Sequence, residues 1–166
     1  MIAAVQDANV LIDLLNAGLL EVSTRLGMTF HVVDVVAEEI EGDDQRRELE
    51  AAISNRWLTV DGLDEAEAEL AASFQLEATP ISFQDAASLS LAQSLKAILL
   101  TGDRPLRNLA QRHSTETHGV LWVLDILLEA SVIDSETATN ALQTMLDHGA
   151  RLPKDECAKR FAAWKE

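Results

Sequence analysis

Residues 2–15, IAAVQDANVLIDLL, contain a short apolar run that ends at Asp7. Residues 97–106, AILLTGDRPL, repeat this pattern, and their apolar run ends just before Asp103. Both runs have the length and composition of buried β-strands, and a helical pattern follows each of them. Strands that alternate with helices form parallel sheets, in which ligands bind at the edge where the carboxyl ends of the strands lie. The sequence therefore places a carboxylate at this edge after each of two strands.

The rest of the chain continues the alternation of strands and helices. We expect three more strands, the last at an edge of the sheet, at residues 29–33, 57–60 and 115–118. This order predicts an α/β fold, a three-layer α/β/α sandwich with a central parallel sheet of four to five strands and additional C-terminal helices. We expect one domain over residues 1–166, with a core at 1–130 and a C-terminal helical extension at 131–166.

Capping residues predict where several helices begin. Asp34 is expected to be the N-cap of a short helix that runs to Glu41. Ser82 is expected to begin the helix FQDAASLSLAQSL, and Gly149 has the position of a residue that follows a helix end.

Composition limits the classes of partner. The chain has 28 acidic and 13 basic residues and a net charge of -15, so local basic side chains or a bound cation must hold any polyanion. Aromatic residues make up 4% of the chain and Tyr is absent, which argues against recognition by base stacking. The single cysteine, Cys157, excludes an internal disulfide and is typical of a reducing compartment. No apolar run reaches about 18 residues and no charged signal-peptide flank is present, so we expect a cytoplasmic protein without membrane contact.

Two further acidic residues are expected at the same edge of the sheet. Glu39 follows the second predicted strand, and Asp85 lies in the first turn of the helix that precedes strand 97–101. Several clustered carboxylates repel one another, and a bound cation relieves this repulsion. Hard oxygen ligands suit Mg²⁺ or Mn²⁺, which activate water in phosphodiester hydrolysis.

Each acidic residue also has a purely structural interpretation. Asp7 and Asp103 could serve only as N-caps, and Asp85 could complete a capping box. Glu39 could be a solvated surface residue, as its neighbour Glu38 is expected to be. The capping interpretation does not explain why all four positions share one edge, so we favour a metal site.

The four blocks, in this order, resemble the PIN-domain family of metal-dependent ribonucleases, which includes the toxins of bacterial VapBC toxin–antitoxin pairs. The blocks that carry the resemblance are VQDANVLIDL, VVAEEI, SFQDAASLSLAQ and ILLTGDRPLRNLA. The resemblance covers about residues 1–123. The segment HGVLWVLDILLEASVID is similar to a PIN subgroup that has a C-terminal helical extension.

This resemblance implies a Mg²⁺- or Mn²⁺-dependent endoribonuclease. It assigns the metal ligands to Asp7, Glu39, Asp85 and Asp103. Asn9 would orient a ligand or a water molecule. The V-x-x-E spacing from Val36 favours Glu39, and Glu38 is the alternative ligand.

Arg104 and Arg107 follow Asp103 directly and could bind RNA phosphates, because guanidinium groups donate two hydrogen bonds to such oxygens. Their alternative interpretation is a pair of solvated bases on an exposed helix. The resemblance further implies RNA as substrate, an antitoxin as a protein partner and a homodimer.

Two other functions were weighed. A phosphohydrolase of the haloacid-dehalogenase type also begins with a strand-end aspartate, but it needs a second aspartate where this chain has Asn9. The non-enzymatic alternative is a catalytically weak or inactive PIN-like module that binds a protein partner.

Overall fold

The computed structural model describes residues 2–165, and its central feature is a sheet of five parallel strands. The strands lie in the order β3-β2-β1-β4-β5. Their bounds are β1 (Ile2–Gln6), β2 (Met28–Val33), β3 (Thr59–Asp61), β4 (Ile98–Leu100) and β5 (Thr117–His118). The predicted strands are confirmed to within two residues at each end, and β3 and β5 form the edges.

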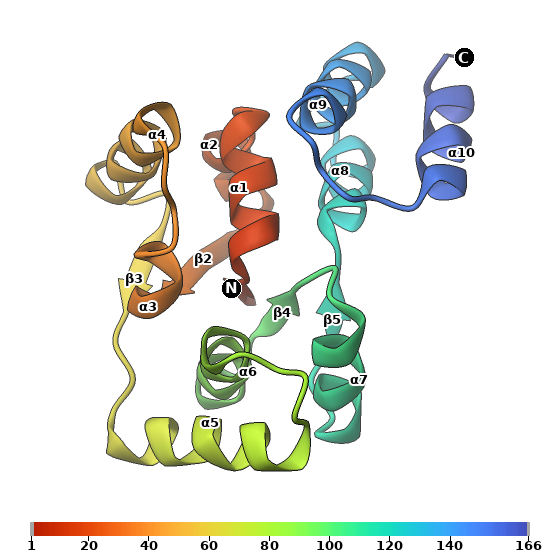
Figure 1. The fold of residues 1–166 in the computed structure, drawn as a ribbon. Coiled ribbons are helices and arrows are strands. Elements are labelled where there is room, and N and C mark those ends of the chain that lie inside the picture. The colour runs from red at the N-terminus through yellow and green to blue at the C-terminus, as the bar shows by residue number, and fades with distance from the viewer. Residues whose placement is uncertain (1, 166) are drawn as a thin grey trace.

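Helices fill the connections between the strands. In chain order they are α1 (Ala8–Asn16), α2 (Leu20–Ser23), the 3-10 turn η1 (Thr24–Leu26), α3 (Asp34–Ala37), α4 (Asp43–Ser54), α5 (Glu65–Glu77), α6 (Phe83–Leu95), α7 (Arg104–Arg112), α8 (Val120–Glu129), α9 (Ser135–Asp147) and α10 (Lys154–Trp164). Figure 1 shows α5, α6 and α7 on one side of the strands and α1, α4 and α8 on the other. The protein is therefore a three-layer α/β/α sandwich with additional C-terminal helices, as predicted.

The order of the strands creates a switch point between β1 and β4. From β1 the chain moves outward to β2 and then β3, whereas from β4 it moves outward in the opposite direction to β5. The connections therefore leave the two central strands toward opposite halves of the sheet. In open α/β sheets the crevice at such a point, at the carboxyl ends of the strands, is the usual ligand site.

Helix α6 packs against the sheet through a buried stretch in which five of seven residues are Ala or Ser. It contacts β1, β2 and β4, and every residue from Ala86 to Ala92 is buried. Ser90 lies in this buried stretch, and its hydroxyl donates a hydrogen bond of 2.7 Å to the Glu67 carbonyl on α5. A helix buried all round lies between two layers, here the sheet and α5, so the start of α6 is held rigidly at the sheet edge.

Two predicted boundaries differ from the structure. The helix expected to run from Asp34 to Glu41 ends at Ala37, and its N-cap is Val33 rather than Asp34. Ile40 is 1% exposed, because the chain turns after Ala37 and brings this side chain into the core. The prediction of a longer helix was wrong, because residues 38–39 form a turn instead of continuing the helix.

The C-terminal helices are fastened to the rest of the protein by packing and by one ion pair. Helix α9 contacts α1, α8 and α10. Arg160 on α10 donates hydrogen bonds of 2.7 and 3.0 Å to the carboxylate of Asp125 on α8. Of the helices in residues 2–165, none combines the length and the apolar character that crossing a membrane requires.

Candidate functional site

Asp7 is the first residue after β1 and lies at the switch point. Its backbone N–H donates a 3.0 Å hydrogen bond to the Leu100 carbonyl at the end of β4. Its carboxylate accepts a 2.8 Å hydrogen bond from the Val10 N–H, so the predicted cap of α1 is present. The residue is only 3% exposed, and burial raises the pKa of its carboxyl group even though hydrogen bonds from Thr101, Val10 and Asn9 lower it.

Asp103 occupies the equivalent position after β4. Its carboxylate accepts a 3.0 Å hydrogen bond from the Leu106 N–H and caps α7, while its own N–H donates to the Thr101 hydroxyl at 3.0 Å. Because β1 and β4 are neighbouring parallel strands, both aspartates lie at the same edge. The negative charge of Asp103 also contributes to the raised pKa of Asp7.

Asp85 lies in the first turn of α6 and is half-buried at the same edge. Its N–H donates a 3.1 Å hydrogen bond to the Ser82 hydroxyl, so the predicted cap at Ser82 is present. Burial, and after it the charges of Asp7, Asp103 and Glu39, raise the pKa of Asp85 from 3.8 to about 6. The capping interpretation therefore describes the backbone of Asp85 but not the electrostatic environment of its carboxylate.

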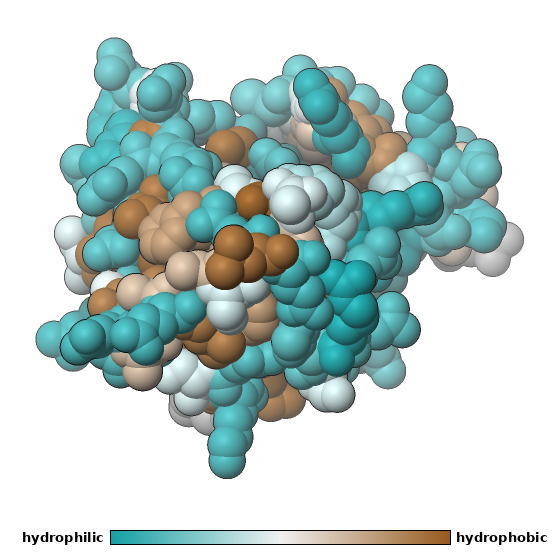
Figure 2. Space-filling view, turned by 60° about the horizontal axis from the view of Figure 1, so that its bottom comes forward, coloured by the Kyte–Doolittle hydropathy of each residue, from teal (hydrophilic) through white to brown (hydrophobic). Residues whose placement is uncertain are grey.

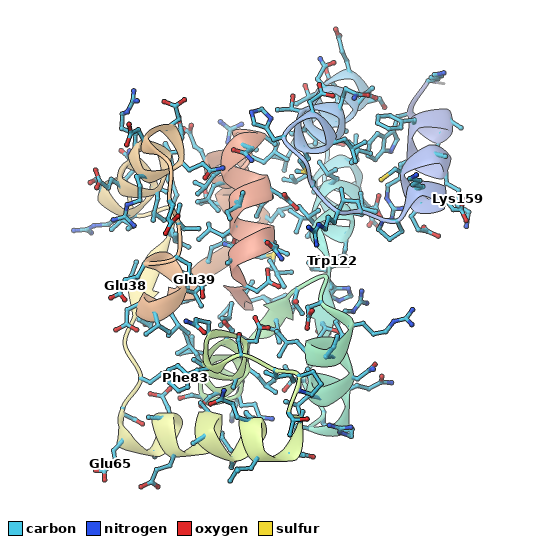
Figure 3. The ribbon with its side chains drawn as sticks, in the orientation of Figure 1. Glu38, Glu39, Glu65, Phe83, Trp122 and Lys159 are labelled. Carbon is cyan, nitrogen blue, oxygen red and sulfur yellow. The ribbon has the colours of Figure 1, made fainter. Side chains whose placement is uncertain are left out.

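Glu39 is exposed in the turn that follows α3, one residue after the equally exposed Glu38. Figure 3 shows both residues at the end of α3, on the side of the molecule where Phe83 marks the start of α6. Glu39 is one of the charges that raise the pKa of Asp85, which puts the two side chains within electrostatic range. Four acids from four separate segments thus converge on one edge of the sheet.

Asn9 is exposed in the first turn of α1, and its backbone N–H, rather than its side chain, hydrogen-bonds the Asp7 carboxylate. This contact helps to fix the orientation of Asp7. The side chain of Asn9 remains free to face solvent beside the acids.

Asp13 also lies near these acids, a position that the sequence did not predict. Asp13 lies on α1, half-buried, and burial followed by the charge of Asp7 raises its pKa from 3.8 to about 7. Its signal in the sequence is a carboxylate inside the apolar stretch LIDLL, four residues after Asn9 and so on the same helix face.

Gln6, the residue before Asp7, is also fully buried. Neither polar atom of its side-chain amide has a hydrogen-bond partner among the described residues. An unpaired buried amide costs roughly 1–3 kcal/mol, so the Gln6 side chain reduces the stability of the fold. Such costly groups require an explanation other than packing.

The donor set at this edge consists of carboxylate oxygens, the ligands that Mg²⁺ and Mn²⁺ prefer. The raised pKa values of Asp7 and Asp85 reflect burial and mutual repulsion, which a divalent cation would relieve. Within residues 2–165, no three His, Cys, Asp or Glu side chains lie close enough together to hold one metal ion as they stand. The chemistry of the donors therefore fits a hard cation.

Arg104 and Arg107 project from the exposed face of α7, directly beyond Asp103. Neither guanidinium forms an ion pair with another residue of the described chain. Both guanidinium groups are therefore available to an anion beside Asp103.

Comparison with known proteins identifies the family. The DUF3368 family, described as a PIN domain, matches residues 3–166, and the chain therefore belongs to the PIN-domain family, whose members in general are nucleases. The crystal structure of PAE2754 from Pyrobaculum aerophilum is similar in fold, with a TM-score of 0.56 and 18% sequence identity over 77% of this chain and 90% of that one. No curated protein sequence matches the chain.

Proposed function

We propose that this protein is a Mg²⁺- or Mn²⁺-dependent endoribonuclease that hydrolyses RNA phosphodiester bonds at the carboxyl edge of its sheet. The observation that carries the proposal is the convergence of Asp7, Glu39, Asp85 and Asp103, with repulsion that raises the pKa of Asp85 to about 6. PIN domains typically use divalent metals and in general bind RNA, which agrees with this site.

In this proposal each acidic residue has a defined task. Asp7 and Asp103 form the fixed half of the site, because their capping hydrogen bonds hold both carboxylates in place. Asp85 and the exposed Glu39 would form the adjustable half and would complete the set of carboxylate ligands. The bound cation would activate the attacking water and neutralise charge on the phosphodiester.

Neighbouring residues would support this arrangement. The Asn9 side chain would orient a ligand or a water molecule, and its backbone N–H holds Asp7. Burial and the charge of Asp7 raise the pKa of Asp13 to about 7, so the ionised form of Asp13 is disfavoured near Asp7. The cation would thus be held mainly by the four acids at the edge.

Cleavage of a mixed RNA pool tests the proposal, with Asp7→Asn and Asp103→Asn beside the wild type and Asp134→Asn as matched control. Asp134 also caps a helix but lies away from the edge, at the start of α9. We expect cleavage that needs Mg²⁺ or Mn²⁺, that both site variants lose by about 100-fold or more, and that the control retains. A folded wild type that neither cleaves RNA nor binds either metal by calorimetry would contradict the proposal.

One observation favours a second function, a PIN-like module that binds a protein partner without catalysis. No three of the described acids stand in metal-binding geometry, as a chain without catalytic activity would also show. A folded wild type that neither cleaves RNA nor binds Mg²⁺ or Mn²⁺, but that binds a protein partner, would support this alternative.

A toxin role, with an antitoxin partner and a homodimer, stays a prediction from the resemblance. Growth of a bacterial host that expresses the chain tests it. Arrest by the wild type but not by Asp7→Asn, relieved by a co-expressed partner, would support a toxin, and unaffected growth would argue against one.

A further inference from the structure

A polar groove begins at the carboxylate edge and has no role in the proposed metal chemistry. It has a volume of about 640 Å³ and is lined by Gly102, Arg104, Arg107, Asn108, Gln111, Thr115, Glu116, Thr117 and Pro153. Gly102 and Arg104 flank Asp103, so one end of the groove opens at the candidate metal site. Its other residues come from α7, the segment that includes β5, and the loop between α9 and α10.

The floor of the groove is the exposed face of α7. Arg104, Arg107, Asn108 and Gln111 follow the spacing of one helix face, while Leu106 and Leu109 on the opposite face are fully buried. Two guanidinium groups and two amides thus present hydrogen-bond donors side by side. Figure 2 shows strongly hydrophilic side chains on the right of the view, where α7 lies, whereas apolar side chains gather over the centre and left.

One wall of the groove comes from the C-terminal extension. Pro153 precedes α10 and lines the groove, and the exposed residues Arg151 and Lys154 lie on either side of it in the chain. In Figure 1 the loop that carries them lies above the start of α7. This loop is held in place because the ion pair between Arg160 and Asp125 fastens α10 to α8.

The charge of the groove is opposite to that of the protein. Arg104 and Arg107 have no ion-pair partner in the described chain, and the one acid in the lining, Glu116, hydrogen-bonds His118 at 3.0 Å. A guanidinium without a carboxylate partner keeps its donors for another anion, and phosphate oxygens match its geometry. None of the lining residues is aromatic, so the groove contacts a backbone and not stacked bases.

We propose that this groove binds the sugar-phosphate backbone of a single RNA strand beyond the cleaved bond, and that the C-terminal extension supplies one wall of it. The inference rests on the proposed ribonuclease function for the identity of the strand. The volume of the groove fits a short piece of one strand. Recognition through phosphates makes the binding depend on salt and not on base sequence.

Fluorescence anisotropy tests this with a fluorescein-labelled single-stranded RNA of about 12 nucleotides. The measurement is made in EDTA, so that it does not depend on metal or cleavage, and at about 50 mM salt and above. The variant pair Arg104→Gln with Arg107→Gln removes the cations of the floor, and Arg151→Gln with Lys154→Gln removes those beside Pro153. The control pair, Arg25→Gln with Arg56→Gln, changes the net charge equally at the opposite edge, because both residues precede strands and neither lines the groove.

We expect the floor variant to bind about tenfold or more weakly and to reduce the slope of log K against log salt by about 1.4, since each phosphate contact contributes about 0.7. The wall variant is expected to weaken binding less, and the control pair to bind as the wild type does. Far-UV circular dichroism and Tm establish that all three pairs are folded.

Three results would overturn the inference: no binding by the wild type at about 50 mM salt, no change in the floor variant, or an equal loss in the control pair. Because the assay excludes metal, it separates this inference from the proposed function. Absence of cleavage with intact binding would contradict the nuclease and leave the groove. Cleavage by the wild type, together with unchanged RNA binding by the floor variant, would support the nuclease and contradict the groove.

Discussion

The starts of α1 and α9 perform the same local task with opposite electrostatic results. At both, an aspartate carboxylate accepts a 2.8 Å hydrogen bond from the backbone N–H three residues on, Asp7 from Val10 and Asp134 from Thr137. The pKa of the exposed Asp134 is lowered by hydrogen bonds from the Thr137 side chain and from the Thr137 backbone N–H. Burial and the nearby Asp103 raise the pKa of Asp7 despite equivalent bonds.

The opposite pKa shifts of Asp7 and Asp134 distinguish an aspartate in the candidate site from one that only begins a helix. A capping hydrogen bond stabilises the ionised carboxylate at either position. At Asp7 the surrounding protein removes water and adds further carboxylates, and the ionised form becomes costly. Under the proposed function, the metal site therefore lies at the start of α1, and Asp134 has only a structural role.

The largest expected effect that tests the comparison is on activity. Asp7→Asn should reduce metal-dependent RNA cleavage by about 100-fold or more, whereas Asp134→Asn should leave it unchanged. Asn keeps a capping oxygen in both variants, so helix starts are preserved. Initial rates on a labelled RNA measure the effect, and an equal loss in both variants would remove the distinction.

Next in size is the response to metal. Mg²⁺ or Mn²⁺ at about 100 times its Kd should stabilise the wild type by about 2.7 kcal/mol, because the ion binds only the folded state. Asp85→Asn removes an adjustable ligand and should abolish most of this gain. Differential scanning fluorimetry with and without metal measures it. A gain unchanged in Asp85→Asn but lost in Asp134→Asn would place the cation elsewhere.

A smaller effect is expected from pH in the absence of metal. The pKa values of Asp85 and Asp13 rise from 3.8 to about 6 and about 7 on folding, so the folded state holds protons that the unfolded state releases. Their contribution is full below about pH 4 and is lost as pH rises through about 6 to 7. Asp13→Asn should therefore raise stability at pH 8 by about 1–2 kcal/mol, after allowance for solvent screening, and change it little at pH 4. Thermal unfolding at the two pH values measures this difference, and an equal shift at both would contradict it.

The smallest effect concerns the exposed cap. Asp134→Ala removes the hydrogen bond to the Thr137 N–H and should lower Tm by a few degrees at most. Because the pKa of Asp134 is lowered on folding, this loss should appear above its ordinary pKa and shrink as pH falls through the folded value. Tm measured across the acidic range checks the sign, which is opposite to that of Asp13.

Local sequence predicted the elements well where one signal dominated. Ser82 was expected to begin the helix FQDAASLSLAQSL, and α6 has those bounds. Local sequence predicted the start of a strand too early where hydrogen bonds to the preceding helix hold the first residues of the expected strand. The strand predicted at 57–60 begins at Thr59, because the Trp57 N–H bonds the Ala52 carbonyl at the end of α4. The strand predicted at 115–118 begins at Thr117, because the Thr115 N–H bonds the Ala110 carbonyl of α7.

For the candidate site, the sequence supplied Asp7, Asp85 and Asp103, since each follows a strand or begins a helix that meets the same edge. It did not supply Asp13 or the groove wall at Pro153. The residues next to Asp13 in the sequence do not indicate that Asp7 lies near it. Pro153 lies beside the groove along α7 only because α10 docks on α8.

The sequence by itself determined the order of strands and helices, the caps that begin them and the polar residues that follow each strand, because these depend on periodicity and on hydrogen bonds within a few residues. The tertiary structure alone decided that β1 and β4 are neighbours, how deeply Asp7 and Asp13 are buried, and that the C-terminal extension flanks α7. Burial and the distances between charges arise from segments far apart in the chain, and they, rather than residue identity, set the pKa of a carboxylate.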